Sequence, residues 1–295
     1  MKRHSGKKKM TVIDAHSHVN WIGIDAKQLV ANMDEFGIDK TWLLTWECPA
    51  HEIDMVSYPS SFAPNRVGMP LEDMLHAVEL FPDRLIPFYA PDPRDPFALD
   101  KLASAVEMHG IRGYGELKVR IMADDPDALR IYALCGKLKL PVIFHIDVTK
   151  PRGGVPSSRQ YWYCYDIDRL ENALKLCPKT IFIGHAPGFW REISGEANDD
   201  AAYPTGPVKP GGKLIRLLDK YPNLYGELSA NSGLNAIRRD REFGKKFLVK
   251  YQDRILFGRD GKDNQHQEYL NSIGLPSPVL EKIFHKNAEE LVPLK

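Results

Sequence analysis

Short apolar runs alternate with segments of helical periodicity along almost the whole chain. The apolar runs are typical of buried strands in a parallel sheet. The segments between them place apolar residues three and four positions apart, which is typical of helices that cover such a sheet. Strands are expected near residues 11–16, 38–46, 84–90, 111–119, 141–146, 180–185, 223–229 and 254–259. Helices are expected near residues 25–36, 71–80, 96–109, 126–138, 166–176, 212–220, 235–250 and 277–284.

Eight strand–helix units in succession predict an α/β fold, the (β/α)8 TIM barrel. We expect one barrel domain over residues 11–295, preceded by a flexible basic N-terminus over residues 1–10. The connections after the second, fifth and sixth strands are too long to be plain linkers, at residues 47–70, 147–165 and 186–211. Loops of such length usually bind ligands or cover a site.

The composition argues against nucleic acid and membranes as partners of this chain, and against secretion. Its 295 residues include 40 Lys and Arg against 39 Asp and Glu, and a net charge of +1 offers little to nucleic acid or to an anionic membrane. No apolar run approaches the roughly 20 residues that span a bilayer. No apolar signal segment follows the basic start, so a cytoplasmic location is expected. The four cysteines lack paired spacing and are expected to be free thiols.

Metal-binding side chains end several of the expected strands. His16 and His18 lie two residues apart at the end of the first strand, so both point to one face of it, while Ala15 and Ser17 point away. Three more potential ligands end the fifth, sixth and eighth strands, namely His145, His185 and Asp260. Because the C-terminal ends of all strands meet at one mouth of a barrel, these five side chains predict a metal site there.

Glu116 ends the fourth strand. Residues 112–118 alternate in polarity, with Glu116 on the polar face and Gly115 and Leu117 on the face expected to pack against helices. Glu116 is therefore expected to point into the barrel mouth. There it can orient a metal ligand, or form an ion pair with a nearby basic residue such as Lys118.

The order of these residues resembles the amidohydrolase superfamily, specifically its amidohydrolase-related (amidohydrolase-2) branch. The pattern is His-x-His, His, His and Asp on the first, fifth, sixth and eighth strands. Further stretches that resemble this branch are Phe-Pro-Asp-Arg-Leu at 81–85, Gly-Tyr-Gly-Glu-Leu-Lys at 113–118, Gly-His-Ala-Pro-Gly at 184–188, Asp-Arg-Ile-Leu-Phe-Gly at 253–258 and Asn-Ala-Glu-Glu-Leu at 287–291. The likeness extends from about residue 11 to residue 293.

The resemblance implies a role for each candidate ligand. It places His16, His18, His145 and Asp260 at metal-ligand positions, and His185 where a side chain either binds a second metal or polarises the substrate. Glu116 resembles the bridging ligand of two-metal members, which include TatD-type nucleases. A divalent ion is implied, zinc first and manganese or another ion otherwise, with one or two per chain. Relatives often form dimers, so a homodimer is compatible with the resemblance.

Aromatic and basic residues are expected around the barrel mouth. Apolar walls with a few cations suit a small organic substrate, which can be aromatic and can carry a carboxylate. Candidates for substrate contacts follow five of the strands: Trp21, Trp46, Lys118, Arg159, Trp190 and Arg191. Arg259 departs from the family pattern, and its outward position favours a salt bridge among the helices over contact with an anionic substrate.

Two reactions fit these residues. In a metal-dependent hydrolase, metal-activated water attacks an amide, lactone or ester carbonyl, Asp260 accepts the proton and His185 polarises the carbonyl. The resemblance also implies an alternative, because the branch contains non-oxidative decarboxylases of carboxylated aromatic or muconate-like substrates, similar to aminocarboxymuconate-semialdehyde decarboxylase. A non-catalytic barrel is disfavoured because an open coordination position would serve no structural purpose. A nuclease is disfavoured by the neutral charge.

Overall fold

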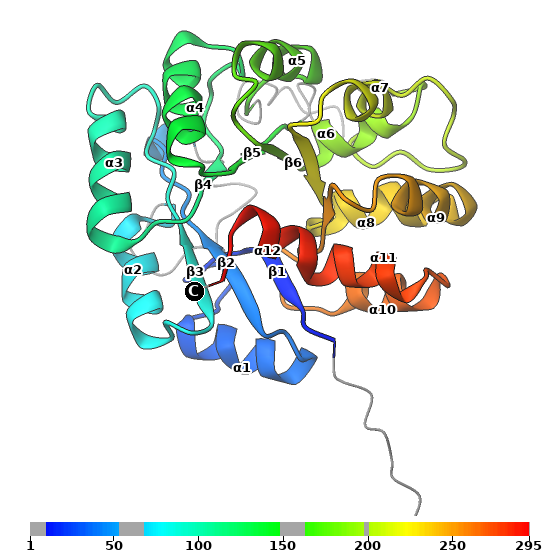
Figure 1. Cartoon of the computed structure of the whole chain (residues 1–295), viewed down its shortest axis with the longest axis horizontal. Coiled ribbons are helices and arrows are strands. Elements are labelled where there is room, and N and C mark those ends of the chain that lie inside the picture. Colours follow the sequence, from blue (N-terminus) through cyan, green and yellow to red (C-terminus); the bar gives the residue numbers. More distant parts are fainter. Residues whose placement is uncertain (1–9, 53–67, 148–162, 198–200, 295) are drawn as a thin grey trace, which may run out of the picture.

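The strands form the centre of the molecule and the helices surround them (Figure 1). The computed structural model describes residues 10–52, 68–147, 163–197 and 201–294. The strands in chain order are β1 (Ile13–Ser17), β2 (Lys40–Leu44), β3 (Leu85–Phe88), β4 (Tyr114–Leu117), β5 (Val142–His145), β6 (Phe182–His185), β7 (Leu224–Glu227) and β8 (Ile255–Leu256). All eight lie within the segments expected to be strands, except for the last residue of β1.

The helices are α1 (Ala26–Phe36), α2 (Leu71–Leu80), α3 (Ala98–His109), α4 (Pro126–Leu138), α5 (Ile167–Leu176), α6 (Pro187–Trp190), α7 (Lys213–Lys220), α8 (Ala230–Arg238), α9 (Arg241–Lys250), α10 (Gln265–Ser272), α11 (Ser277–Glu281) and α12 (Asn287–Leu291). A π-helical turn, Lys282–Lys286, joins the last two. None of the helices described here is long and apolar enough to cross a membrane.

Parallel pairing closes the strands into the predicted TIM barrel. Strands β1 to β3 pair in order, and so do strands β4 to β8. Backbone hydrogen bonds join the two sets at both seams: Tyr89 N donates to Gly113 O at 3.1 Å, and Ala15 N donates to Phe257 O at 2.9 Å. The closed barrel brings the C-terminal ends of all strands to one mouth.

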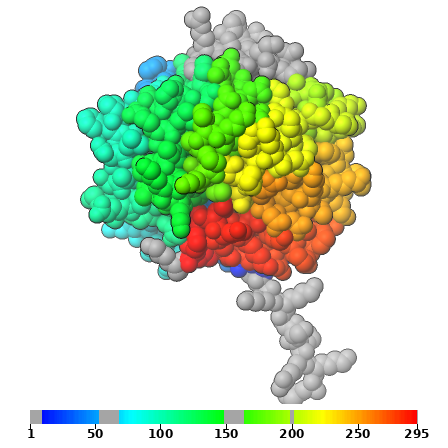
Figure 2. Space-filling view, turned by 45° about the horizontal axis from the view of Figure 1, so that its top comes forward, coloured from blue at the N-terminus to red at the C-terminus, as the bar shows by residue number. Residues whose placement is uncertain are grey.

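Apolar side chains fill the barrel interior and α12 closes its far end. Ala288 and Val292 pack against interior residues that include Ile13, Trp42 and Leu256. In the space-filling view the C-terminal segment is seated among the helices of the ring, with no opening into the barrel at this face (Figure 2). Chemistry is therefore confined to the opposite mouth.

The expected helix over residues 235–250 is wrong, because the structure has two helices there. Helix α8 ends at Arg238 and α9 begins at Arg241. The carboxylate of Asp240 accepts a hydrogen bond from Phe243 N at 3.0 Å, which makes it the N-cap of α9. Helices α6, α10 and α12 were not expected at all. All three are short, and their periodicity spans too few turns to be recognised.

Each of the three long connections is described only in part. Residues 53–67 after β2, residues 148–162 after β5 and residues 198–200 after β6 lie outside the described part of the chain, as do residues 1–9 of the basic N-terminus. The four cysteines are free thiols, as expected.

Two strands change register directly before a candidate ligand. Between Asp14 and Ser17, strand β1 advances three residues while β2 advances two, so β1 carries an extra residue. Ala15 consequently packs in the barrel interior, which corrects the expectation that it faces away. Ser17 does face outward, where its hydroxyl donates to Asp14 at 3.3 Å. The extra residue lets His16 point into the mouth although Ala15 also faces inward.

Strand β4 has the same irregularity, between Tyr114 and Leu117. Gly115 therefore faces the interior, where an added Cβ would lie 3.1 Å from Ile143 Cβ, rather than the helices as alternation predicted. Tyr114 packs on the helix side instead. Glu116 still points into the mouth, but because of the register shift rather than simple alternation.

Candidate metal centre

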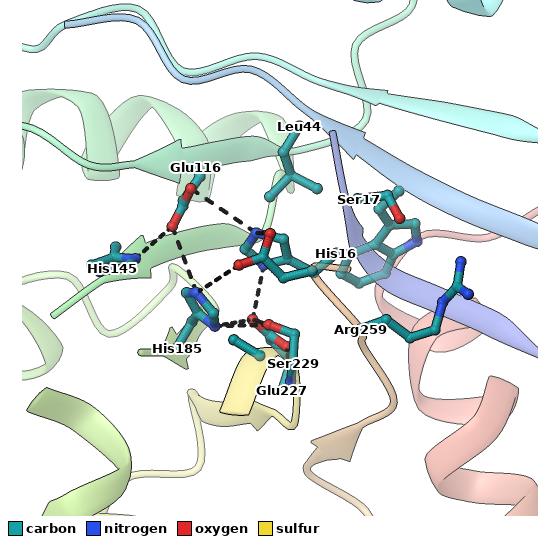
Figure 3. A network of polar contacts seen from close by, with 12 residues as sticks. His16, Ser17, Leu44, Glu116, His145, His185, Glu227, Ser229 and Arg259 are labelled. Atoms are coloured by element: carbon teal, nitrogen blue, oxygen red, sulfur yellow. Dashed lines mark hydrogen bonds and ion pairs between the residues drawn. The ribbon is translucent and has the colours of Figure 1, made fainter. Parts of the chain in front are cut away.

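Six side chains from five strand ends converge at the mouth of the barrel (Figure 3). They come from β1, β4, β5, β6 and the segment after β8, and all are among the ligands expected from the sequence: His16, His18, Glu116, His145, His185 and Asp260. Ligand atoms in three overlapping groups of these residues lie within 4.8 Å of one another. The structure therefore brings together every residue proposed as a metal ligand.

One group of donors surrounds the two histidines of β1. The Nε2 atoms of His16 and His18 lie 3.1 Å apart. Asp260 Oδ1 is 3.8 Å from each of these nitrogens. Glu116 Oε2 lies 3.5 Å from His18 Nε2 and 4.0 Å from His16 Nε2. Four residues thus direct ligand atoms toward one small volume.

A second group lies around the other carboxylate oxygen of Glu116. Its Oε1 is 2.7 Å from His145 Nδ1 and 3.7 Å from His185 Nε2. The two oxygens of Glu116 therefore face different sets of histidines. This division fits a carboxylate shared between two ions. The 2.7 Å contact is also a hydrogen bond between Glu116 and the His145 ring.

Hydrogen bonds assign the protons on His16 and His18. His16 Nδ1 lies 2.9 Å from a carboxylate oxygen of Glu227, and His18 Nδ1 lies 2.9 Å from Leu44 O. These oxygens can only accept, so each Nδ1 carries a proton. In the neutral rings both Nε2 lone pairs then face each other across 3.1 Å. Such lone pairs repel unless a proton or a metal ion lies between them.

One buried ligand atom tests whether this site fits a metal ion. Within the described residues, Asp260 Oδ1 is buried and has no hydrogen-bond partner. Buried polar atoms without partners are costly and rare in folded proteins. Imidazole and carboxylate donors together suit zinc or manganese. The residues present therefore fit a divalent ion.

The electrostatics of the site also favour a cation. Burial alone would lower the pKa of His16, but the carboxylates of Asp260, Glu227 and Glu116 outweigh it and raise that pKa to about 10. Burial alone would raise the pKa of Glu116, but Lys118 and the neighbouring histidines hold that pKa well below its usual value. Glu116 is therefore ionised inside the protein, where its charge attracts a metal ion strongly.

Glu227 was missed by the sequence analysis. It ends β7 and is fully buried behind the histidines, with its carboxylate 2.9 Å from His16 Nδ1 and 2.7 Å from His185 Nδ1. The signal was available, because Glu227 is a carboxylate at the end of an apolar strand, as Glu116 is.

Arg259 forms the outward salt bridge that its position favoured. Its Nε lies 2.7 Å from Asp14 Oδ2, and its Nη1 donates to Asn32 of α1 at 2.9 Å. The side chain is 1% exposed and lies on the helix side of the barrel wall. The alternative contact with an anionic substrate is therefore not observed.

An aromatic wall stands beside His18. The Trp21 ring lies 6.3 Å from the His18 ring and 6.1 Å from the Trp46 ring, measured between centroids. Lys118 Nζ lies 4.2 Å above Trp46, and Trp46 Nε1 donates to Lys118 O at 2.7 Å. Trp46 itself is fully buried, so it supports Trp21 and Lys118 from beneath.

Of the other expected substrate contacts, Trp190 does not lie at the mouth. Trp190 is buried on the helix side of β7, with its ring 3.1 Å from the Cβ that Gly226 lacks, and this corrects its expected place at the mouth. A tryptophan ring is large and apolar, and here the space between β7 and α9 accommodates it. Arg191 is buried with its Nε 3.3 Å from Glu192 Oε1. Arg159 lies outside the described residues.

Comparison with known proteins places the chain in a family of enzymes. A family model described as amidohydrolase matches residues 13–294, so the chain belongs to the amidohydrolase family. Within it, the chain falls in the amidohydrolase-2 branch, as the resemblance implied. No curated protein matches the sequence.

Solved structures share the barrel at low sequence identity. An uncharacterised TIM-barrel protein from Bordetella bronchiseptica has a TM-score of 0.63 and 15% identity, with 96% of this chain and 98% of that chain covered. A probable 2-pyrone-4,6-dicarboxylic acid hydrolase from Acinetobacter baumannii, with citric acid bound, has a TM-score of 0.61 and 17% identity, with 96% and 99% covered. A dihydroxybenzoic acid decarboxylase from Polaromonas, with manganese and 2-nitroresorcinol bound, has a TM-score of 0.59 and 18% identity, with 96% and 97% covered. These likenesses confirm the fold.

Proposed function

We propose that this protein is a metal-dependent hydrolase that cleaves an amide, lactone or ester bond in a small organic substrate. The observation that carries the proposal is the position of Glu116, whose two oxygens face separate groups of histidines. A divalent ion bound by these residues would polarise a substrate carbonyl and activate water. A carboxylate shared between two ions is typical of sites that direct water at a substrate.

The donor groups suggest which residues hold each ion. His16, His18 and Asp260 would hold one ion, and His145 and His185 the other, with Glu116 between them. Zinc suits this set of nitrogen and oxygen donors. Manganese is the alternative, and it is bound in the decarboxylase from Polaromonas.

The hydrogen bonds of His185 favour a ligand role over direct polarisation of the substrate. Its Nδ1 lies 2.8 Å from Ser229 Oγ and 2.7 Å from a Glu227 oxygen. Burial lowers the pKa of His185, so the ring is neutral. A neutral ring that donates from Nδ1 has only a lone pair on Nε2, and therefore cannot donate a hydrogen bond to a carbonyl.

Asp260 is proposed as the residue that accepts a proton during hydrolysis. Its Oδ1 faces His16 and His18 and its Oδ2 lies 3.9 Å from His185 Nε2, so the carboxylate lies above both donor groups. The Asp260 side chain is 19% exposed, more than the side chains of Glu116 and of the neighbouring histidines. A proton can therefore leave through Asp260 toward solvent.

A second candidate function is non-oxidative decarboxylation of a carboxylated aromatic compound. Lys118 supports this alternative, because its ammonium group is buried 4.2 Å from the centre of the Trp46 ring, lowers the pKa of Glu116, and can attract a carboxylate. The structurally similar protein from Polaromonas, a dihydroxybenzoic acid decarboxylase, agrees with that chemistry. The same metal ligands would serve either reaction.

One experiment separates these functions. The protein is stripped with a chelator, reloaded with Zn²⁺ or Mn²⁺, and supplied with aryl lactones, esters, amides and carboxylated phenols. Acid release with ¹⁸O incorporation from water supports the hydrolase, whereas CO₂ release without ¹⁸O incorporation supports the decarboxylase. A chain that binds neither metal would contradict both functions.

A further inference from the structure

We propose that Glu227 is a positioning residue that holds His16 and His185 in the ring orientation that turns Nδ1 toward Glu227 and Nε2 toward the metal centre. The inference rests on the proposed metal-dependent function, and it concerns a residue outside the ligand set. Glu227 is fully buried and lies behind the two histidines, on the side away from the other donors (Figure 3).

One oxygen of Glu227 serves both histidines. Oε1 lies 2.9 Å from His16 Nδ1 and 2.7 Å from His185 Nδ1. The Ser229 hydroxyl donates to the same oxygen at 2.8 Å, and Ser229 N donates to Oε2 at 2.7 Å. Both oxygens of this buried carboxylate are thus satisfied by hydrogen bonds.

These contacts determine where the protons lie. The single hydroxyl proton of Ser229 is donated to Glu227, so Ser229 Oγ can only accept from His185 Nδ1. His16 Nδ1 likewise faces an oxygen that only accepts. Both rings therefore carry the Nδ1 proton and present the Nε2 lone pair to the metal centre. Protonation at Nε2 would remove the lone pair that a metal needs.

The surrounding structure makes room for this carboxylate and holds it in place. A Cβ added to Gly258 would lie 2.6 Å from Glu227 Oε2, so a larger residue there would displace the carboxylate. From the other side of the strand, Trp190 Nε1 donates to the backbone oxygen of Glu227 at 3.0 Å. Trp190, which the sequence suggested as a substrate contact, thus supports the strand end that carries Glu227.

Glu227 also links the two groups of donors. His16 belongs to the group around β1, and His185 belongs to the group around Glu116 Oε1. By contrast, the ring of His18 is held by a backbone carbonyl, which no side-chain substitution removes. Loss of the Glu227 charge should therefore lower the affinity for both metal ions together. Substitution of a carboxylate that orients a metal-binding histidine typically costs about 10- to 100-fold in metal affinity.

The test compares metal binding by the whole protein and three variants. Stripped wild type, E227Q, E227D and E171Q are titrated with Zn²⁺ against a chromophoric chelator. Glu171 is the matched control, because it accepts hydrogen bonds from Arg216 and Lys220 far from the mouth. We expect a loss of about 10- to 100-fold in affinity for E227Q at every metal equivalent, a smaller loss for E227D, which keeps the charge, and no change for E171Q.

Wild-type affinity in E227Q, or E227D that binds no better than E227Q, would overturn the inference. If neither variant folds, imidazole ¹⁵N spectra of wild type replace them, and a His16 or His185 ring that lacks the Nδ1 proton at neutral pH would overturn it. A wild-type chain that binds no metal would instead defeat the proposed function. The two failures are therefore distinguishable.

Discussion

The Nε2 atoms of His16 and His18 lie 3.1 Å apart, although both rings carry a proton on the opposite nitrogen. Glu227 and Leu44 O hold these protons, so the short distance requires a metal ion between the rings or, without metal, the second proton that the raised pKa of His16 supplies. This relationship ties the orientation of two side chains to the occupancy of a metal site. It also explains why three carboxylates surround a single buried histidine, as the raised pKa of His16 reflects.

Replacing His16 by alanine should remove activity and leave the barrel folded. The variant loses a ligand at the centre of the first donor group, and metal catalysis is worth several kcal/mol, so we expect turnover to fall by roughly 10³-fold or more. Elemental analysis measures the metal content, and circular dichroism checks that the barrel is folded. His109→Ala at the exposed end of α3 is the control. Wild-type turnover in H16A would refute the assignment of the site.

Asp260→Asn should preserve the fold and lower the rate of the chemical step. Asp260 has a φ of 47°, and asparagine adopts this left-handed conformation readily, so the backbone should not change. Loss of a proton acceptor typically costs about 10²- to 10⁴-fold in rate. Single-turnover kinetics with the reloaded enzyme measure this loss. A variant with an unchanged rate would remove Asp260 from the mechanism.

Asp14→Asn should destabilise the protein by about 3–5 kcal/mol, because it leaves the buried Arg259 charge without its partner. Thermal or urea unfolding measures the change. Asp168→Asn breaks the exposed pair with Lys213 and should cost only about 0–1 kcal/mol. Equal effects in the two variants would contradict a structural role for the Asp14–Arg259 pair.

Lys118→Met should weaken the binding of carboxylated substrates. Charge-assisted hydrogen bonds contribute about 1.5–3 kcal/mol, so KM for such a substrate should rise roughly 10- to 100-fold. An uncharged ester of the same aromatic group serves as control and should be affected much less. If both substrates respond equally, Lys118 acts through Trp46 and the aromatic wall rather than through its charge.

The stability of the protein should fall in acid partly through Glu171. Hydrogen bonds from Arg216, Lys220 and Tyr221 hold the pKa of Glu171 well below its ordinary value of 4.5. A lowered carboxyl pKa stabilises the folded state above pH 4.5, and this contribution is lost as the pH falls below that value. E171Q should be less stable at pH 7 by about 1 kcal/mol or less. Its stability should approach that of wild type in acid, and a constant difference from pH 7 to pH 2 would contradict this account.

Much of the metal centre could be predicted because barrel topology is simple. Once eight strand–helix units are recognised, residues that end strands must meet at one mouth, and His145 and His185 needed no further information. The direction in which each side chain points was harder to predict than its place at a strand end. Alternation predicted that Ala15 and Gly115 face away from the interior, but both face inward because β1 and β4 change register.

By itself, the sequence determined the barrel, the candidate metal ligands and the family, because these depend on hydrophobic periodicity and on which residues follow each apolar run. Only the tertiary structure decided that Glu116 faces two donor groups and that Glu227 holds His16 from behind. His16 and Glu227 are 211 residues apart, and no local pattern encodes their contact. Their distance is fixed by the closure of the barrel and by the register of strands that do not neighbour each other in the chain.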